Sequence, residues 1–188
     1  MISPYEKCPV YENRDYLLRL VEDSDAAGLF CVYSDEKAVP FFNSDNCNGD
    51  DFHYTKMEYM QGAIRAWRQE YERGGFVRWT VIDKHRQCAI GTVELFNRQA
   101  EDYFNDCGLL RLDLGSGYER REVITGILSM MLPSVFELFG CRMMATKVPP
   151  FAEERKAAVE QLGFAASEEK LVGGHDRKIY TDYYVLQP

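Results

Sequence analysis

Three consecutive segments with the side-chain pattern of strands constrain the fold of this chain most. Residues 76–82 and 88–96 flank a short polar turn, an arrangement that predicts a β-hairpin. In the third segment, 109–114, alternate leucines share one face, while Arg111 and Asp113 share the other. Strands that follow one another without an intervening helix predict antiparallel pairing, because parallel neighbours need a long crossover connection.

Helices are predicted on either side of these strands. One helix is indicated by apolar residues that recur every three or four positions: Met57, Met60, Ile64, Trp67 and Tyr71. Thr55 and Glu58 form a capping box at its start. The other predicted elements are a strand over 16–21, a helix entered at 25–30, a helix with apolar positions from 124 to 139 and a kink at Pro133, a strand over 141–148, a helix over 152–162, and strands over 164–171 and 179–186. This order predicts one mixed α/β domain over residues 1–188.

The charge balance argues against one class of partner. Thirty acidic residues against 22 basic ones give a net charge of −8, whereas a surface that binds nucleic acid carries the opposite sign. An acidic surface favours a cationic ligand or a basic protein segment, although it also serves solubility alone. The chain shows no uncharged apolar run of about 18 residues and no apolar signal core at its start, so we expect a cytoplasmic protein with no membrane partner.

The spacing of cysteine and histidine argues against a metal centre. The six cysteines include no Cys-x-x-Cys pair, and several lie in apolar runs, as expected of reduced thiols in a core. The three histidines are equally scattered. We therefore expect no zinc site in this protein.

The turn after the third strand opens a long helix and is the strongest candidate for a binding site. Residues 115–117 begin like a dinucleotide fingerprint, but Arg120 stands where the third glycine is required. The free amides and the dipole of a helix start can hold an anion such as a pyrophosphate, and Arg120 and Arg121 add two cations there. Residues 116–119 also fit a capping box, which would satisfy the same amides internally. The residues alone leave both interpretations open.

Several short motifs follow one another in an order and spacing that is specific when taken together. They are residues 18–25, 33–39 and 90–95, the sequence Gln161-Leu162-Gly163-Phe164, and residues 182–186. Over Tyr16 to Leu186 the chain resembles the GNAT superfamily of N-acetyltransferases, in the branch that includes the ribosomal-protein N-terminal acetyltransferases.

The resemblance implies a mostly antiparallel twisted sheet of about seven strands with about four helices, splayed open between 109–114 and 141–148. Acetyl-CoA, as the cosubstrate, would lie in the split, with its pantetheine against the backbone of Leu112 to Leu114, Asp113 included. The reaction would be direct attack of a primary amine on the thioester, assisted by a base. The pyrophosphate would lie at the following helix start, on Glu119, Arg120, Arg121, Glu122, Val123, Ile124 and Thr125.

The chain departs from the family pattern in two places. The phosphate loop of the family has small residues where Glu122 and Ile124 stand here. The last helix of the family usually carries an Asn and a Ser, and these positions hold Ala152 and Arg155, of which Arg155 is a candidate cofactor contact. Two interpretations follow: an active N-acetyltransferase, or a GNAT fold that has lost catalysis and binds a ligand or a partner protein.

Glu94 and Asp113 are the candidate catalytic bases, because each lies on a strand expected beside the split. Each also fits a solvent-facing strand carboxylate. Arg111 lies on the same face of its strand as Asp113 and offers it a partner for an ion pair.

The resemblance places the acceptor around the first two helices and the loop between them. Aromatic side chains can hold an amine by cation–π contact, and the candidate substrate contacts are Phe42, Phe52 and His53. The acceptor would be an amine-bearing small molecule or a protein N-terminus. We expect a monomer or a homodimer.

Overall fold

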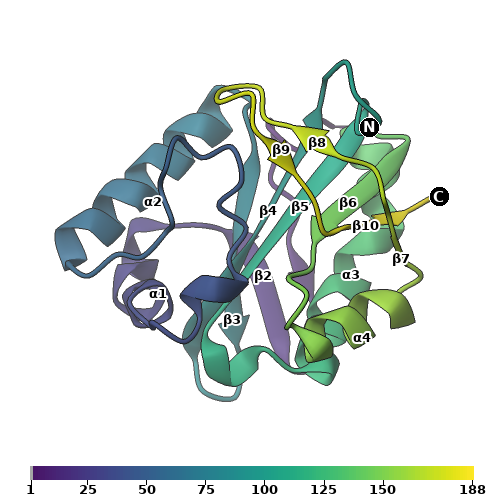
Figure 1. Cartoon of the computed structure of the whole chain (residues 1–188). Helices are drawn as coiled ribbons and strands as arrows, with labels where there is room; N and C mark the ends of the chain where they lie inside the picture. The colour runs from purple at the N-terminus through teal and green to yellow at the C-terminus, as the bar shows by residue number, and fades with distance from the viewer. Residues whose placement is uncertain (1) are drawn as a thin grey trace.

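The computed structural model describes residues 2–188, in which a twisted eight-stranded sheet carries helices on both faces (Figure 1). The strand order in the described chain is β1-β2-β3-β4-β5-β6-β10-β7, and β8 and β9 form a separate two-stranded sheet. The strands are β1 (Tyr11–Glu12), β2 (Tyr16–Leu20), β3 (Val77–Asp83), β4 (Cys88–Arg98), β5 (Cys107–Leu114), β6 (Met143–Lys147), β7 (Ala165–Ala166), β8 (Leu171–Val172), β9 (Ile179–Tyr180) and β10 (Tyr183–Leu186). The helices are α1 (Ala26–Tyr33), α2 (Met57–Glu72), α3 (Arg121–Phe139) and α4 (Glu153–Gln161), with short 3-10 helices η1 (Asp23–Asp25), η2 (Val39–Phe41) and η3 (Ser116–Tyr118). The predicted mixed α/β class is confirmed.

Strands β2 to β5 pair antiparallel in sequence order, as the strand-like segments predicted. Gly91 of β4 lies so close to β5 that a Cβ there would be 2.1 Å from the carbonyl oxygen of Asp113. No larger residue fits without moving a strand, so this contact fixes the position of β4 against the end of β5.

Strands β5 and β6 run parallel and separate half-way along β5. Their paired residues are 107–110 of β5 and 143–146 of β6. Within the described residues, 111–114 have no pair on the β6 side, while β6 stays paired with β10 as far as Lys147. The sheet is therefore split between the two strands at which the family resemblance predicted a splay.

The two faces of the sheet carry different layers (Figure 1). Helices α3 and α4 pack on the face that bears Leu110, Leu112 and Leu114, while α1, α2 and the loop between them build a second core on the other face. By length and composition α3 is apolar enough to cross a membrane. Its inner side, however, is buried in the core against the sheet, as is typical of the central helix of a globular domain. The buried residues of α3 are Val123, Ile124, Ile127, Leu128, Met131, Leu132, Val135 and Phe139.

Both predicted capping boxes are wrong. Helix α2 begins after Lys56 with no hydrogen bond from a capping side chain, so Thr55 does not cap it. Residues 116–119 form the 3-10 turn η3 and its end, and α3 begins only at Arg121. Pro133 lies inside α3, and the helix continues through it to Phe139.

The last two predicted strands are each divided in the structure. Residues 164–171 give β7 and β8, and residues 179–186 give β9 and β10. Asp182 has a φ of +67°, a left-handed conformation that interrupts an extended strand. Because β8 and β9 pair with each other rather than with β10, they form a small hairpin that lies over the main sheet (Figure 1).

Candidate active site

Side chains from three neighbouring strands form a row of charges on the face that α1 and α2 cover. Arg78 of β3 lies opposite Glu94 of β4, and Glu94 lies opposite Arg111 of β5. Thr92 and Asp113 form the next pair along the same face, because side chains two residues apart on a strand point the same way. These five residues are between 1% and 8% exposed, so the charges lie inside the protein rather than at its surface.

Glu94 is fully engaged as an ion-pair partner. Its carboxylate accepts hydrogen bonds from Arg78 and from Nη1 of Arg111, the latter at 2.8 Å. Burial raises the pKa of Glu94, but the charges of the two arginines outweigh burial and hold the pKa below its ordinary value. A carboxylate with a lowered pKa and both oxygens bonded is poorly suited to accept a proton.

Asp113 is held differently. Its Oδ2 accepts a hydrogen bond of 2.9 Å from the Tyr33 hydroxyl and lies 3.5 Å from Nη1 of Arg78, whereas its Oδ1 has no hydrogen-bond partner in the described chain. Burial is the main cause that raises the pKa of Asp113, and it outweighs the charge of Arg78. Asp113 also lies on the part of β5 that has separated from β6. Of the two candidate bases, Asp113 is therefore the one that has an oxygen without a hydrogen-bond partner in the described chain and a pKa raised above its ordinary value.

A second buried ion pair lies where the chain leaves the two separating strands. Arg155 of α4 binds Glu119 through Nη2 and through Nε, the latter at 3.1 Å, and its Nη1 donates to the Phe41 carbonyl at 3.0 Å. The side chains of Arg155 and Glu119 are only 2% and 3% exposed. Burial is the main cause that raises the pKa of Glu119, and the charge of Arg155 acts against it.

The start of α3 is capped from α4. The backbone amide of Arg121 donates to Oε2 of Glu154 at 2.9 Å. A carboxylate from another element thus occupies a position at which a helix start binds anions. Arg120 and Glu122 are exposed and lie 3.6 Å apart as an ion pair.

The other predicted cofactor residues divide into two groups. Leu112, Asp113 and Leu114 are buried on β5, with their β6-facing edge unpaired in the described chain. Val123 and Ile124 lie with their side chains in the core, and the hydroxyl of Thr125 is buried without a hydrogen-bond partner among residues 2–188.

These residues fit acetyl-CoA at one end of the split more readily than at the other. The unpaired backbone of 111–114 fits the amide-bearing pantetheine arm. At the phosphate end, the guanidinium of Arg155 is a suitable ligand, but Glu119 already holds it. The fit to the phosphates therefore depends on release of Arg155 from Glu119.

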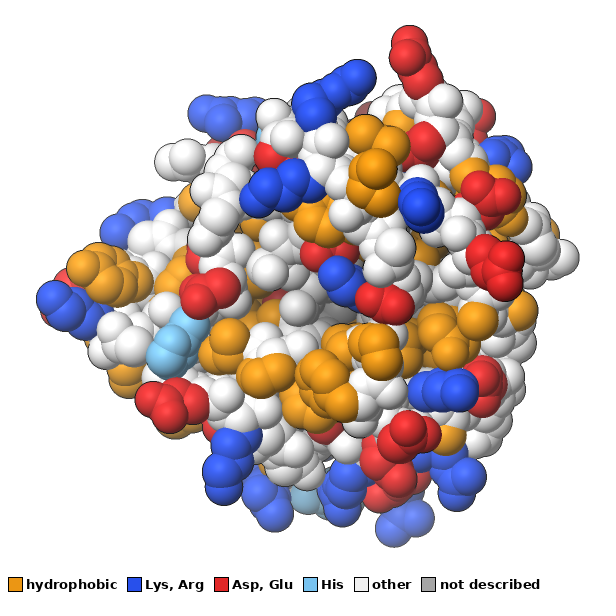
Figure 2. All heavy atoms as spheres, in the orientation of Figure 1, with side chains coloured by type: hydrophobic (Ala, Val, Ile, Leu, Met, Phe, Trp, Pro, Cys, Tyr) orange, Lys and Arg blue, Asp and Glu red, His pale blue; other side chains and the backbone are white. Residues whose placement is uncertain are grey.

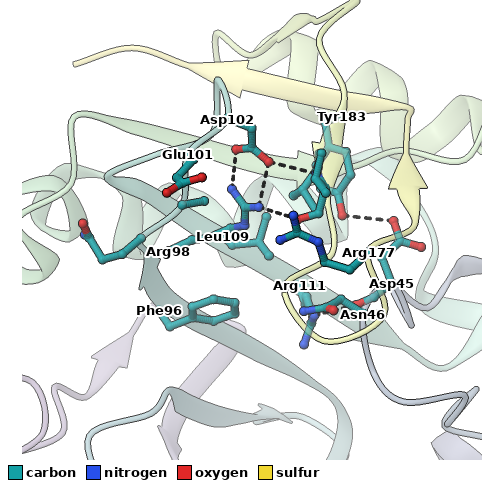
Figure 3. Close-up of a pocket in the computed structure, with 15 residues that line it drawn as sticks. Asp45, Asn46, Phe96, Arg98, Glu101, Asp102, Leu109, Arg111, Arg177 and Tyr183 are labelled. Carbon is teal, nitrogen blue, oxygen red and sulfur yellow. Dashed lines mark hydrogen bonds and ion pairs between the residues drawn. The ribbon is translucent and has the colours of Figure 1, made fainter.

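A cavity of about 410 Å³ opens on the same face of the sheet, beside this cluster (Figure 3). Its floor includes Phe96 of β4 with Leu109 and Arg111 of β5. Figure 3 shows Arg98 and Asp102 paired on one side, and Asp45 beside Tyr183 on the other. Figure 2 shows this face hollowed near its centre, with acidic and basic side chains mixed around the hollow. The cavity reaches Arg111 and therefore approaches the split from the face of the sheet that α1 and α2 cover.

None of the predicted acceptor contacts lines this cavity. Phe42 and Phe52 are 7% and 5% exposed and pack in the core between α1 and α2. The Phe42 ring lies 5.1 Å from that of Tyr33, and the Arg78 guanidinium lies 5.6 Å from the Phe52 ring. His53 lies half-buried in the same loop. The structure thus places the two phenylalanines behind the charged row, where they support it.

Sequence reasoning missed the residues that do line the cavity. One signal was present: Phe96 and Arg98 are in phase with Glu94, and Leu109 is in phase with Asp113, so alternation along the strands places them on the same face. No such signal existed for Asp45, which reaches the cavity from an irregular loop.

Residues 15–165 match the family model described as an acetyltransferase (GNAT) domain. The chain belongs to the GNAT acetyltransferase family. A comparison with curated proteins finds no match.

Solved structures of the GNAT fold cover nearly the whole chain. The ribosomal-protein-S5-alanine acetyltransferase from Vibrio fischeri is 17% identical, with a TM-score of 0.69 over 94% of both chains. RimL, a ribosomal L7/L12 alpha-N-protein acetyltransferase solved in complex with coenzyme A, is 11% identical, with a TM-score of 0.69 over 95% of this chain and 98% of that one. An acetyltransferase from Salmonella typhimurium that modifies the N-terminal serine of L7/L12 is 12% identical, with a TM-score of 0.67 over 96% and 99%. The predicted branch is therefore found among these GNAT structures, and the interpretation that catalysis has been lost is not favoured.

Proposed function

We propose that this GNAT acetyltransferase transfers the acetyl group of acetyl-CoA to a primary amine that enters through the cavity beside β5. The observation that carries the proposal is Asp113: a buried carboxylate with one oxygen that has no partner among residues 2–188, on the segment of β5 that has left β6. A group of this kind can accept a proton beside a thioester held in the split.

The chain's own residues supply three functions in this reaction. When bound, acetyl-CoA would provide the acyl group as a thioester: its C–S bond would break as the C–N bond forms, and the leaving CoA thiolate would take up the proton that the acylated nitrogen loses. An ammonium group cannot attack, so Asp113 takes its proton through Oδ1, directly or through one water. Tyr33 fixes the orientation of the Asp113 carboxylate by its hydrogen bond to Oδ2, and Glu94 with its two arginines holds the adjacent row rigid.

The acceptor is a cation before it reacts, and the cavity offers it one carboxylate without an ion-pair partner in the described chain. Asp102 pairs with Arg98 and Asp45 pairs with Lys147, so Glu101 is the wall carboxylate that can bind an ammonium group. Phe96 and Leu109 offer an apolar floor. Its volume of about 410 Å³ is enough for a small amine or for the end of an extended peptide. The names of the ribosomal-protein acetyltransferases with the same fold support a protein N-terminus as the acceptor.

A calorimetric titration with acetyl-CoA, followed by transfer assays, tests the proposal. We expect saturable binding, and acetylation of either N-terminal peptides or small primary amines when panels of both are supplied. Absence of saturable binding at about 1 mM acetyl-CoA would refute the enzymatic function. Binding without transfer to any amine in either panel would refute the assignment of the cavity as the acceptor site.

A further inference from the structure

The ion pair between Glu119 and Arg155 takes no part in the proton transfer proposed above, yet it is among the most deeply buried charged pairs of the described chain. The Arg155 guanidinium has three bonded nitrogens: Nε and Nη2 bind the Glu119 carboxylate, and Nη1 binds the Phe41 carbonyl. Removing two charges from water costs free energy unless they bind each other well. The fold must therefore hold Glu119 and Arg155 in this geometry to offset the cost of burying them.

The pair joins the two sides of the split. Glu119 follows β5 through η3, and Arg155 follows β6 on α4, so the ion pair links the chain segments that leave the separating strands. The contact with Phe41 adds a third segment, η2, from the acceptor side. Figure 1 shows α4 beside the start of α3, with the loop that carries η3 between the sheet and that helix start.

The pair also lies beside the proposed base. The charge of Arg155 acts on the pKa of Asp113, and the charge of Asp113 acts on the pKa of Glu119. Along the chain, Glu119 lies between Asp113, near the end of β5, and Arg121, the first residue of α3. An acyl carrier with its thioester near Asp113 and its phosphates at α3 would have to pass the same place.

Both anionic positions at this end of the split are filled by carboxylates of the chain itself. Glu119 binds the Arg155 guanidinium, and Glu154 binds the first amide of α3. Phosphate oxygens make the same charge-assisted hydrogen bonds to a guanidinium and to helix amides. Exchange of a carboxylate for a phosphate would leave Arg155 paired, while the displaced Glu119 side chain would have to turn toward water or take up a proton.

We propose that Glu119 and Arg155 form a latch on the cofactor slot, which acetyl-CoA opens by exchanging its phosphates for the Glu119 carboxylate on Arg155. This inference rests on the proposed function. It assigns Arg155 as a phosphate ligand and Glu119 as the internal competitor for that ligand.

The test compares Glu119→Gln with Glu122→Gln. Both variants remove one negative charge from the start of α3, but only Glu119 binds Arg155, whereas Glu122 is 67% exposed in its side chain. We expect Glu119→Gln to bind acetyl-CoA about tenfold more tightly than the wild type, and Glu122→Gln to change the affinity about twofold or less. Equal affinities in Glu119→Gln and Glu122→Gln would overturn the latch.

A second probe separates the phosphates from the rest of the cofactor. S-acetylpantetheine lacks the phosphates, so its affinity should be the same in the wild type and in Glu119→Gln. A gain with this probe as large as the gain with acetyl-CoA would show that Glu119 blocks the slot without competing for Arg155, and would overturn the proposed exchange. Replacing Arg155 as well, in Glu119→Gln with Arg155→Gln, should abolish the gain in affinity for acetyl-CoA.

The design remains informative if Glu119→Gln is less stable than the wild type. In that case the rise in melting temperature on adding acetyl-CoA is compared between variants, and we expect it to be larger in Glu119→Gln than in Glu122→Gln. Equal rises would again overturn the latch. If no variant and no wild-type sample binds acetyl-CoA, the proposed function itself fails, which is a different result from equal binding by all of them.

Discussion

At the scale of single residues, two carboxylates on neighbouring strands differ in their surroundings more than in their positions. Glu94 and Asp113 are both 1% exposed, but Glu94 is bonded to two arginines, while one oxygen of Asp113 has no partner in the part of the chain that the structure describes. The difference gives them opposite pKa shifts and, in our proposal, different tasks.

Asp113→Asn should remove the base and leave the fold intact. We expect kcat to fall about 100-fold, because a general base contributes at least that much. Since burial raises the pKa of Asp113 above its unfolded value, the ionised side chain lowers stability at neutral pH, and the neutral amide should unfold at a temperature equal to or above that of the wild type. Steady-state kinetics together with thermal unfolding check both parts; a loss of activity accompanied by a loss of stability would contradict the assignment.

The pH dependence of activity should report the same group. Below its raised pKa Asp113 is protonated and cannot accept a proton, so kcat/KM should fall as the pH drops through that value. The acidic limb of the profile should be missing in Asp113→Asn. Persistence of the limb in this variant would assign it to another group.

Glu94→Gln tests a structural role. The substitution leaves Arg78 buried with less compensating charge, and we expect a loss of about 3–5 kcal/mol in the free energy of unfolding. Urea denaturation measures this loss. Glu122→Gln serves as the control, because its exposed side chain should change stability by less than about 0.5 kcal/mol.

Strand alternation predicted the face on which Asp113 lies, but not its burial or its partners. The interpretation of both carboxylates as solvent-facing is wrong, because α1 and α2 cover that face and Tyr33 reaches Asp113. Arg111, which the sequence offered as a possible partner for Asp113, binds Glu94 instead. Cross-strand register decides these partners, and a single strand's sequence does not contain it.

At the scale of elements, the start of α3 is capped by a side chain from another helix, α4. From the sequence, the first amides of this helix could be bonded either by a capping box or by a bound anion. In the structure, Glu154 of α4 accepts the hydrogen bond from the first amide of α3. Local motifs could not predict this cap, because its donor and acceptor are 33 residues apart.

Glu154→Ala should therefore destabilise the protein by about 1 kcal/mol through loss of this cap. Glu153→Ala is the matched control: it removes an acidic residue from the same first turn of α4. Thermal unfolding of the two variants measures the difference. Equal losses in both would mean that the charge in this turn, rather than the hydrogen bond to Arg121, provides the stability.

The contact between β4 and β5 is a second element-scale feature. Gly91→Ala would place a methyl group 2.1 Å from the Asp113 carbonyl oxygen, so β4 and β5 must move apart. We expect a loss of about 3 kcal/mol or more and reduced transfer activity, as for overpacking in a rigid site. Gly117→Ala, which meets no atom within 4 Å, should leave both properties near wild type. Chemical denaturation of the two alanine variants provides the comparison.

At the scale of the whole molecule, the proposed acceptor cavity and the proposed cofactor slot meet at the point where β5 leaves β6. The order of strands and helices was predictable, because hydrophobic periodicity changes clearly between them along the chain. The cavity was not predictable, because parts of its walls come from an irregular loop and from the β8–β9 hairpin. The residues of this hairpin were predicted as parts of two longer strands.

Gly174→Leu should separate the two substrates kinetically. Gly174 lines the cavity, and a Cβ there meets no atom of the described chain within 4 Å, so a larger side chain can be added at the cavity wall without a clash at its Cβ. We expect KM for the amine to rise about tenfold and the Kd for acetyl-CoA to stay unchanged. A parallel increase in both constants would mean that the cavity is not specific to the acceptor.

The row of Arg78, Glu94 and Arg111 also affects the register in which the strands pair during folding. A slip of one residue between neighbouring strands reverses the face on which every side chain of a strand lies. In this sheet, such an error would drive an arginine or a glutamate into the leucine-lined layer beneath α3 and bring aliphatic side chains among the charges. Misaligned pairings of β3, β4 and β5 are therefore strongly disfavoured. The charged residues that surround the proposed base thus also specify the register in which these strands pair.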